Sequence, residues 1–482
     1  MISSLFFGCL ALASVYVFLT DRNALLCLLS IGFTQDMVRK VTPGEPIIFI
    51  VTVGVLFGAI LLGIWMKRGL AYTQEPFFRW TQDIRVPLLM FLAVLFLQLL
   101  HSFLRYNNII VGLIGLTTYL APFVAVIVGY HLGNSVTGIR AFMKLYIVFG
   151  MIVAFSVVLA FIGMEWTILK EVGLGIKIYD QGTVLKSYAG IMRSGEVAAW
   201  HISTSACLLL TLLFTSNKPR GVWLVAFIVV LLIIAVALTG RRKMLMMVTL
   251  FVSFYFIGLL YYRKTLDPKY FLGIVYVAIT VWFGFEIISF DDYSDSLRNY
   301  IARGSTVFSE ASGRFVELGI NPIQWAYDRV GIIGGGLGIA SQGSYLFNLS
   351  DVAGGSGEGG LGKIMVELGL PGLLAIGWLV LAITNYINSG LKLCARTPVN
   401  RALLPLMVSL SVLLAVNAAT FSVATQVYGD IFILILLGLF GGFIFALPKL
   451  VMSSLQQQSR QQSASSAKLI IPADVTGQSR YS

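Results

Sequence analysis

The sequence predicts an all-α membrane protein, a polytopic bundle of transmembrane helices with one long loop outside the membrane. Hydrophobic residues make up 57% of the 482 residues and charged residues only 12%, whereas soluble globular domains carry about 25% charged residues. Apolar runs long enough to cross about 30 Å of hydrocarbon as helices recur almost to residue 447. No large soluble domain fits between these runs, so lipid is the natural solvent for this chain.

The apolar runs give about twelve or thirteen candidate helices. In chain order they are 2–19, 24–33, 47–66, 88–104, 109–132, 145–164, 197–215, 221–238, 244–262, 270–288, 364–387, 402–421 and 431–447. The second run is too short to span a membrane alone, and Gln35, Asp36, Arg39 and Lys40 follow it. It therefore either re-enters the membrane or recruits these polar residues into a longer helix, and the side of the N-terminus depends on the answer.

The chain divides into a membrane domain and a polar tail. Residues 1–447 form the membrane domain, which includes a large loop over 289–363, and residues 448–482 form a Gln- and Ser-rich tail that we expect to be disordered. The first span has no basic segment before it and no small-residue cleavage site, so it is expected to remain as a helix. The four scattered cysteines have neither disulfide nor zinc spacing.

Basic residues in the short connectors determine the expected orientation. The net charge of +12 comes mainly from lysines and arginines between spans and after the last one, where they mark the cytoplasmic side. This explains the charge without nucleic acid, which we exclude as a partner. The C-terminus is then cytoplasmic, and segments 165–196 and 289–363 face the outer side of the membrane.

One basic cluster departs from this rule. The same count places Arg241, Arg242 and Lys243 on the outer side, between two adjacent spans. Either the count is wrong by one helix at this point, or the cluster is an anion site on the outer face.

Three outward arginine groups indicate what that anion is. Arg193 precedes one span, Arg241 and Arg242 close another, and Arg314 lies in the long loop. A guanidinium group binds phosphate through two hydrogen bonds, so several around one cavity would hold a diphosphate and stabilise it as a leaving group. The alternatives are that Arg193 pairs with Glu196 and that Arg314 lies on the surface of an amphipathic helix.

The long loop contributes a helical segment and a glycine-rich passage. The apolar spacing over 315–330 predicts one or two short helices on the membrane surface. Glycines are dense over 331–362, and Gly336 and Gly338 would let the backbone approach a glycan or a phosphate, or simply allow turns against the membrane surface.

Glu358 and Glu196 are the candidate bases, because a carboxylate beside the phosphates could take a proton from an attacking sugar hydroxyl. Glu358 could equally be a solvated loop residue, and Glu286 and Glu367 are either structural or functional at membrane depth. His201 is the one histidine expected near Glu196. No metal site is expected, since Asp291, Asp292 and Asp295 lack further ligands, and no cofactor is implied.

The order of these motifs resembles the O-antigen ligase and O-antigen polymerase superfamily of bacterial membrane proteins. The resemblance covers about residues 191–372 and rests on five elements in the same order. They are an arginine that opens a span (Arg193), a polar element that closes another (Thr239-Gly240-Arg241-Arg242), a Gly-Arg element in a long outer loop (Gly313-Arg314), a Pro- and Gly-rich passage (Asn321-Pro322 with 334–338) and a Glu-x-Gly-x-x-Gly element (Glu367-Leu368-Gly369-Leu370-Pro371-Gly372).

The resemblance implies a helical glycosyltransferase of the GT-C type that works without metal and inverts the anomeric centre. Its donor would be an undecaprenyl diphosphate-linked glycan, and its other partners a glycan acceptor, membrane lipid and further polysaccharide export proteins. Arg193, Arg241 and Arg314 would bind the diphosphate with support from Arg242, and Glu358 or Glu196 would be the base.

One departure matters, because the ligases carry a histidine shortly before the Glu-x-Gly helix and this chain has Ser356-Gly357-Glu358-Gly359 there. Glu358 would replace that histidine, or the protein is a polymerase or exopolysaccharide variant. From other classes, a transporter or flippase of lipid-linked sugars and a noncatalytic assembly subunit remain alternatives.

Overall fold

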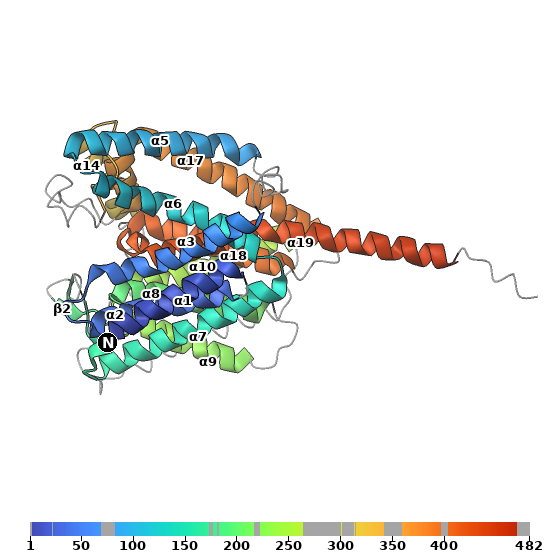
Figure 1. Ribbon diagram of the computed structural model, residues 1–482, viewed down its shortest axis with the longest axis horizontal. Helices are drawn as coiled ribbons and strands as arrows, with labels where there is room; N and C mark the ends of the chain where they lie inside the picture. Colours follow the sequence, from blue (N-terminus) through green and yellow to red (C-terminus); the bar gives the residue numbers. More distant parts are fainter. Residues whose placement is uncertain are drawn as a thin grey trace, which may run out of the picture.

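The structure, a computed structural model, confirms the predicted all-α polytopic bundle (Figure 1). It describes residues 2–21, 23–68, 82–172, 177–180, 183–215, 222–263, 300, 313, 315–341, 359–396 and 403–469. Within these residues, 10 helices are long and apolar enough to cross a membrane. The protein is therefore a multi-pass membrane protein.

The main helices correspond to the predicted spans, although several of them are longer, such as α17 over 360–396 where 364–387 was predicted. They are α1 (Ile2–Leu19), α2 (Ala24–Val41), α3 (Thr52–Arg68, preceded by η1, Ile47–Val51), α5 (Gln82–Tyr106), α6 (Ile109–Leu132), α7 (Val136–Phe161), α8 (Gly195–Phe214), α9 (Val222–Leu238), α10 (Arg242–Arg263), α17 (Gly360–Arg396), α18 (Leu403–Val423) and α19 (Ile431–Leu469). The span predicted over 270–288 lies outside the described residues.

The short apolar run over 24–33 is part of a complete helix, α2. Helix α2 continues to Val41 by recruiting the polar residues that follow residue 33, and Gln35, Asp36 and Lys40 are all buried in it. Their polar groups have partners: Asp36 accepts from the backbone N of Arg193 at 3.0 Å, and Lys40 donates to the carbonyl of Gly190 at 2.6 Å. Because α2 crosses the bundle as a complete helix, α1 begins at the end of the bundle opposite to the end where α19 leaves it (Figure 1).

The helices differ sharply in how much of their surface lies inside the bundle. In α8 and in the spanning part of α19, 89% of the residues are buried, whereas in α1 only 17% are. Helix α19 also packs closely against α6, where a Cβ on Gly442 would lie 2.4 Å from the carbonyl oxygen of Val126. Small residues allow such close backbone approach in membranes, so α8, α6 and α19 form the centre, and α1 faces lipid.

The glycine-rich passage is fixed to a break in α17. Gly369 has φ 66°, which interrupts the helix and separates the N–H of Leu370 from its helical partner, the carbonyl of Val366. Both groups bond instead to the passage: Leu370 donates to Ile332 at 2.8 Å, and Gly335 donates to Val366 at 2.7 Å. The break in the helix and the conformation of the loop therefore depend on each other.

Two short helices precede the glycine-rich passage, as the apolar spacing predicts. They are η4 (Val316–Ile320) and α14 (Asn321–Val330), and Ala326 is buried where α14 packs on α17. The segment before α8 instead forms a hairpin, β1 (Lys177–Asp180) with β2 (Thr183–Lys186), paired antiparallel with Lys177 opposite Lys186. The carbonyl of Lys186 accepts from the hydroxyl of Tyr300, whose pKa is raised by burial and by the neighbouring Tyr188.

The polar tail differs from the expectation for its first part. Residues 448–482 were expected to be disordered, but α19 continues through Pro448 to Leu469. A helix that is already formed extends without a new nucleation cost, and no glycine or proline follows Pro448 before residue 469. The remaining residues, 470–482, lie outside the described part.

Candidate functional site

The predicted site elements gather at one end of the bundle. The start of α8, the start of α10 and the end of α18 meet there, since Arg241 pairs with Glu196 and Lys243 donates to the carbonyl of Val423 at 2.8 Å. The residue before α17 also belongs to this end, because a Cβ on Gly359 would lie 3.1 Å from the carbonyl oxygen of Ser422. The basic cluster 241–243 and the glycine-rich passage therefore lie on the same side of the membrane domain.

Arg193 is buried in a network of acids. It is 7% exposed and pairs through Nη2 with Asp430 at 2.9 Å, while its backbone N donates to Asp36 at 3.0 Å. Asp430 also caps α19, accepting from the N–H groups of Phe432 and Ile433. Arg193 therefore joins α2, α8 and α19, and it pairs with Asp430 and not with Glu196.

Arg241 is the more accessible cation. Gly240, with φ 71°, forms the turn between α9 and α10 that presents it, and its Nη1 lies 2.9 Å from Oε1 of Glu196. The two side chains are 19% and 18% exposed. With its amide turned to donate, Gln426 also lies 2.9 and 3.1 Å from the two Glu196 oxygens. Glu196 thus holds Arg241 in place, an arrangement that favours a positioning role over the role of base.

The other basic residues of the cluster are anchored at the same place. Arg242 opens α10 and is 7% exposed. Lys243 is tied to the end of α18 through the carbonyl of Val423. The turn is fixed from the other side as well, because Ser187 donates to the carbonyl of Thr239 at 3.0 Å.

Two predicted catalytic residues, Arg314 and Glu358, lie outside the described residues. Their neighbours are placed: Gly313 is exposed, and Gly359 lies against Leu318 and the end of α18. The structure therefore gives no geometry for these two side chains.

Gly336 and Gly338, which were expected to let the backbone approach a substrate, pack closely against neighbouring helices. Their φ values are 103° and 87°, and a Cβ would lie 2.9 Å from the Ser102 backbone and 1.9 Å from the Val111 carbonyl oxygen respectively. Helices α5 and α6 therefore pack directly against the backbone at both glycines. Ser102 and Tyr106 of α5 also donate to carbonyls of the passage, at 2.9 and 3.1 Å.

His201 belongs to the core and not to the site. It is 0% exposed, shares a hydrogen bond of 2.8 Å with the Tyr146 hydroxyl, and packs against Phe33, Trp200 and Phe432. Sequence position alone could not show that α8 is enclosed by other helices on all sides. Among the described residues, no three His, Cys, Asp or Glu side chains are grouped to hold a metal ion.

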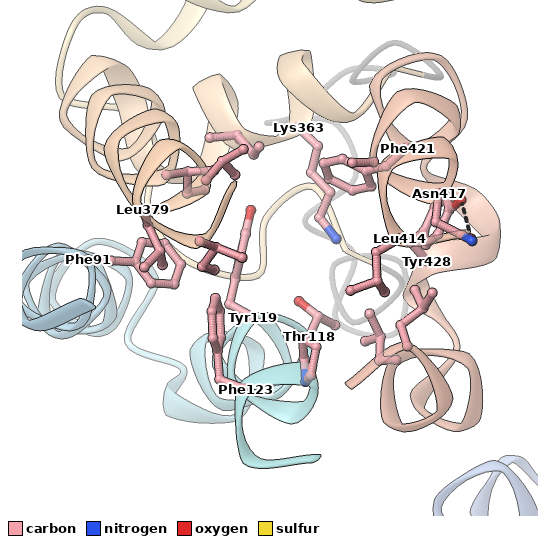
Figure 2. Close-up of a pocket in the computed structure, with 18 residues that line it drawn as sticks. Phe91, Thr118, Tyr119, Phe123, Lys363, Leu379, Leu414, Asn417, Phe421 and Tyr428 are labelled. Carbon is pink, nitrogen blue, oxygen red and sulfur yellow. Dashed lines mark hydrogen bonds between the residues drawn. The ribbon is translucent and has the colours of Figure 1, made fainter. Parts of the chain in front are cut away.

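The structure also contains a cavity that the sequence did not reveal. It has a volume of about 290 Å³ and lies between α5, α6, α17, α18 and α19, with apolar side chains on most of its wall (Figure 2). The lining includes the exposed residues Val380 and Ala418, so the cavity opens at the lipid-facing surface of the bundle. The lining also includes Phe421 and Tyr428, which lie close in sequence to the residues that hold the basic cluster, Val423 and Gln426.

Lys363 enters this cavity from the first turn of α17 (Figure 2). It is 7% exposed, and its Nζ lies 5.9 Å from the centre of the Tyr119 ring. One turn later, Glu367 is fully buried and accepts from the Tyr119 hydroxyl at 2.8 Å and from the N–H of Ala340 at 3.1 Å. Glu367 therefore connects α17, α6 and the glycine-rich passage, which is a structural role.

No protein-family model, no curated protein and no solved structure matches this chain. Its class is therefore defined by the fold and the site themselves. It is a multi-pass membrane protein with a cationic cluster at one end of the bundle, next to an apolar cavity that opens toward lipid.

Proposed function

We propose that this protein is a membrane glycosyltransferase that polymerises or ligates undecaprenyl diphosphate-linked oligosaccharide at the periplasmic face of a bacterial inner membrane. The observation that carries the proposal is the meeting of the basic turn 241–243 with the starts of α8 and α17 at one end of the bundle. The order of its motifs, which resembles the O-antigen ligase and polymerase superfamily, supplies the chemistry.

In this proposal, Arg241 is the main contact to the diphosphate. Its side chain is partly exposed and oriented by Glu196, so its guanidinium could bind phosphate without moving far, and Arg242 and Lys243 add positive charge. Arg314 would complete the cradle from the loop. Arg193 binds no substrate in this scheme, because its guanidinium is buried and already paired with Asp430.

At the anomeric carbon, the transfer step forms one C–O bond and breaks another, while one proton moves from the acceptor hydroxyl to a carboxylate. The acceptor hydroxyl attacks the anomeric carbon of the donor sugar from the face opposite the diphosphate, Glu358 takes the hydroxyl proton, and the C–O bond to the diphosphate breaks. Undecaprenyl diphosphate leaves with the bonding electrons, and the anomeric centre is inverted. Cationic groups around the departing phosphates stabilise the negative charge that develops there.

The test is elongation by the purified protein in proteoliposomes that contain a lipid-linked repeat unit. We expect wild-type protein to lengthen the glycan, and Arg241→Ala to reduce the rate by about a hundredfold or more, the usual effect of removing one transition-state contact. Arg241→Lys should be intermediate, because it keeps the charge without the paired hydrogen bonds. Lys170→Ala is the matched control, a cation whose side chain is 69% exposed.

Three results would contradict the proposal. One is elongation at the wild-type rate by folded Arg241→Ala protein. Another is movement of the lipid-linked sugar across the bilayer without elongation, which would identify a transporter or flippase. The third is binding without either activity, which would indicate a noncatalytic assembly subunit.

A further inference from the structure

The cavity beneath the basic cluster combines an apolar wall with one buried cation. Its described lining residues come from five long helices and, at Tyr428, from the short 3-10 helix over Gln426–Gly429. They are apolar apart from a few side chains, of which Lys363 alone carries a formal charge. Asn417 and Tyr428 bond to each other at 3.0 Å, and Asn417 also accepts from Trp200 at 2.7 Å. The side chains of Asn417 and Tyr428 therefore already have hydrogen-bond partners within the protein. Lys363 is the cation that faces the cavity.

Within the described part of the chain, the ammonium group of Lys363 has no hydrogen-bond acceptor. Its nearest acid, Glu367, interacts with it only electrostatically, because the two oxygens of that carboxylate accept from Ala340 and Tyr119. Figure 2 shows the Lys363 nitrogen directed between Tyr119, Thr118 and Phe421 into the cavity. A buried ammonium group strongly favours an anionic partner that supplies oxygen acceptors.

We propose that this cavity binds the start of a polyprenyl chain, with Lys363 bonded to the lipid's phosphate group. This inference rests on the proposed function and adds to it a second cationic contact, separate from the arginine cluster, and a position for the lipid chain. Charge complementarity argues for the phosphate, and the opening at Val380 and Ala418 lets the rest of the chain continue into the bilayer.

The wall of the cavity suits a hydrocarbon chain, because its lining is apolar apart from Lys363 and a few polar side chains. The aromatic rings of Phe91, Phe123 and Phe421 suit the flat double bonds of isoprene units.

The Lys363 site lies near the arginine cluster in the bundle. Lys363 donates its backbone N–H to the carbonyl of Gly359 at 3.1 Å, and Gly359 packs against Ser422. The adjacent residue, Val423, accepts from Lys243. The two basic sites therefore both lie next to the end of α18, which places the proposed lipid site beside the arginine cluster.

The test measures binding of undecaprenyl phosphate to the full-length purified protein by native mass spectrometry or by competition with a labelled probe. Lys363→Met removes the charge but keeps the length of the side chain, and we expect it to weaken binding by about tenfold or more, since hydrogen bonds to charged groups are the strong ones. Lys363→Arg should retain binding, and Lys170→Met, at an exposed lysine, should leave binding unchanged.

A second variant tests the apolar part independently of the lysine. Ala418 is exposed at the opening of the cavity, so Ala418→Phe should narrow the opening without disturbing the fold, and it should also weaken binding of undecaprenyl phosphate. Dioleoylphosphatidylglycerol should compete poorly. Equal competition by this phospholipid, or wild-type binding by folded Lys363→Met and Ala418→Phe proteins, would overturn the inference.

The elongation assay separates this inference from the proposed function. If wild-type protein binds the lipid through Lys363 but lengthens no glycan, the inference stands and the glycosyltransferase proposal fails. If wild-type protein elongates glycan and Lys363→Met binds the lipid as wild type does, the inference alone fails.

Discussion

At the scale of single residues, the two arginines that look alike in the sequence have different surroundings. Arg193 lies among buried carboxylates, with Asp430 1% exposed and Asp36 3% exposed, whereas Arg241 and Glu196 form a partly exposed pair. A buried ion pair that loses one partner leaves an uncompensated charge, but an exposed pair contributes little to stability. Arg193 therefore belongs to the structure, and Arg241 is the better candidate for substrate contact.

This difference predicts opposite effects of substitution on stability. Arg193→Ala should lower the free energy of unfolding by about 3–5 kcal/mol, and Arg241→Ala by clearly less, because solvent reaches the Glu196 carboxylate that remains. Thermal unfolding of the detergent-solubilised proteins would measure both. The double variant Arg193→Met with Asp430→Asn should recover much of the loss, because it removes both charges while the asparagine side chain can still cap the helix. Equal stability of the two single variants would contradict this assignment.

At the scale of elements, α17 shows how a helix and a loop determine each other's conformation. The break at Gly369 requires φ 66°, and a Cβ there would lie 2.3 Å from the Ile332 carbonyl oxygen. The sequence contains two residues that could cause the break, Gly369 and Pro371. The hydrogen bonds of Leu370 and Val366 to the glycine-rich passage assign it mainly to the glycine and its docked loop.

Gly369→Ala should therefore destabilise the protein, and Pro371→Ala should not. Backbone strain of about 1–3 kcal/mol is expected for alanine at this φ, with overpacking against the loop in addition. Limited proteolysis of the glycine-rich passage and thermal unfolding would measure the effect. A suitable control is Gly377→Ala in the same helix, where nothing lies within 4 Å of the added Cβ. Equal resistance of all three variants would show that the passage is held in another way.

At the scale of the whole molecule, the completed helix α2 determines how the two ends of the bundle relate. With α2 as a crossing helix, the turn at Pro43, the segment at Glu165 and the cluster 241–243 lie at one end. The connector at Asn134 lies at the other end, since it follows α6 and precedes α7. The positive-inside rule then predicts that the first end faces the periplasm.

Cysteine labelling tests this arrangement directly. In a variant without the native cysteines, Pro43→Cys, Glu165→Cys and Asn134→Cys each place one thiol at an exposed position. A membrane-impermeant thiol reagent applied to spheroplasts should label the first two and not the third until the membrane is permeabilised. Labelling of Pro43→Cys and Glu165→Cys from opposite sides would rule out a common end, and labelling of Asn134→Cys alone would invert the proposed orientation.

The sequence by itself determined the fold class and most of the spans, because a membrane helix must be long and apolar whatever its neighbours are. It also predicted that arginines distant along the chain share one end of the bundle, since short connectors leave little freedom in topology. The sequence could not show which of these arginines is neutralised by a buried carboxylate. That depends on Asp430, far along the chain from Arg193, and on Glu196 facing Arg241.

Only the tertiary structure decided the roles that depend on packing. Gly336 and Gly338 lie against α5 and α6, His201 is enclosed in the core, and Lys363 enters a cavity whose walls come mainly from five helices. The physical reason is that hydrophobicity along the chain reports the surrounding solvent, whereas burial, ion pairing and cavities arise from contacts between segments that the linear order does not specify.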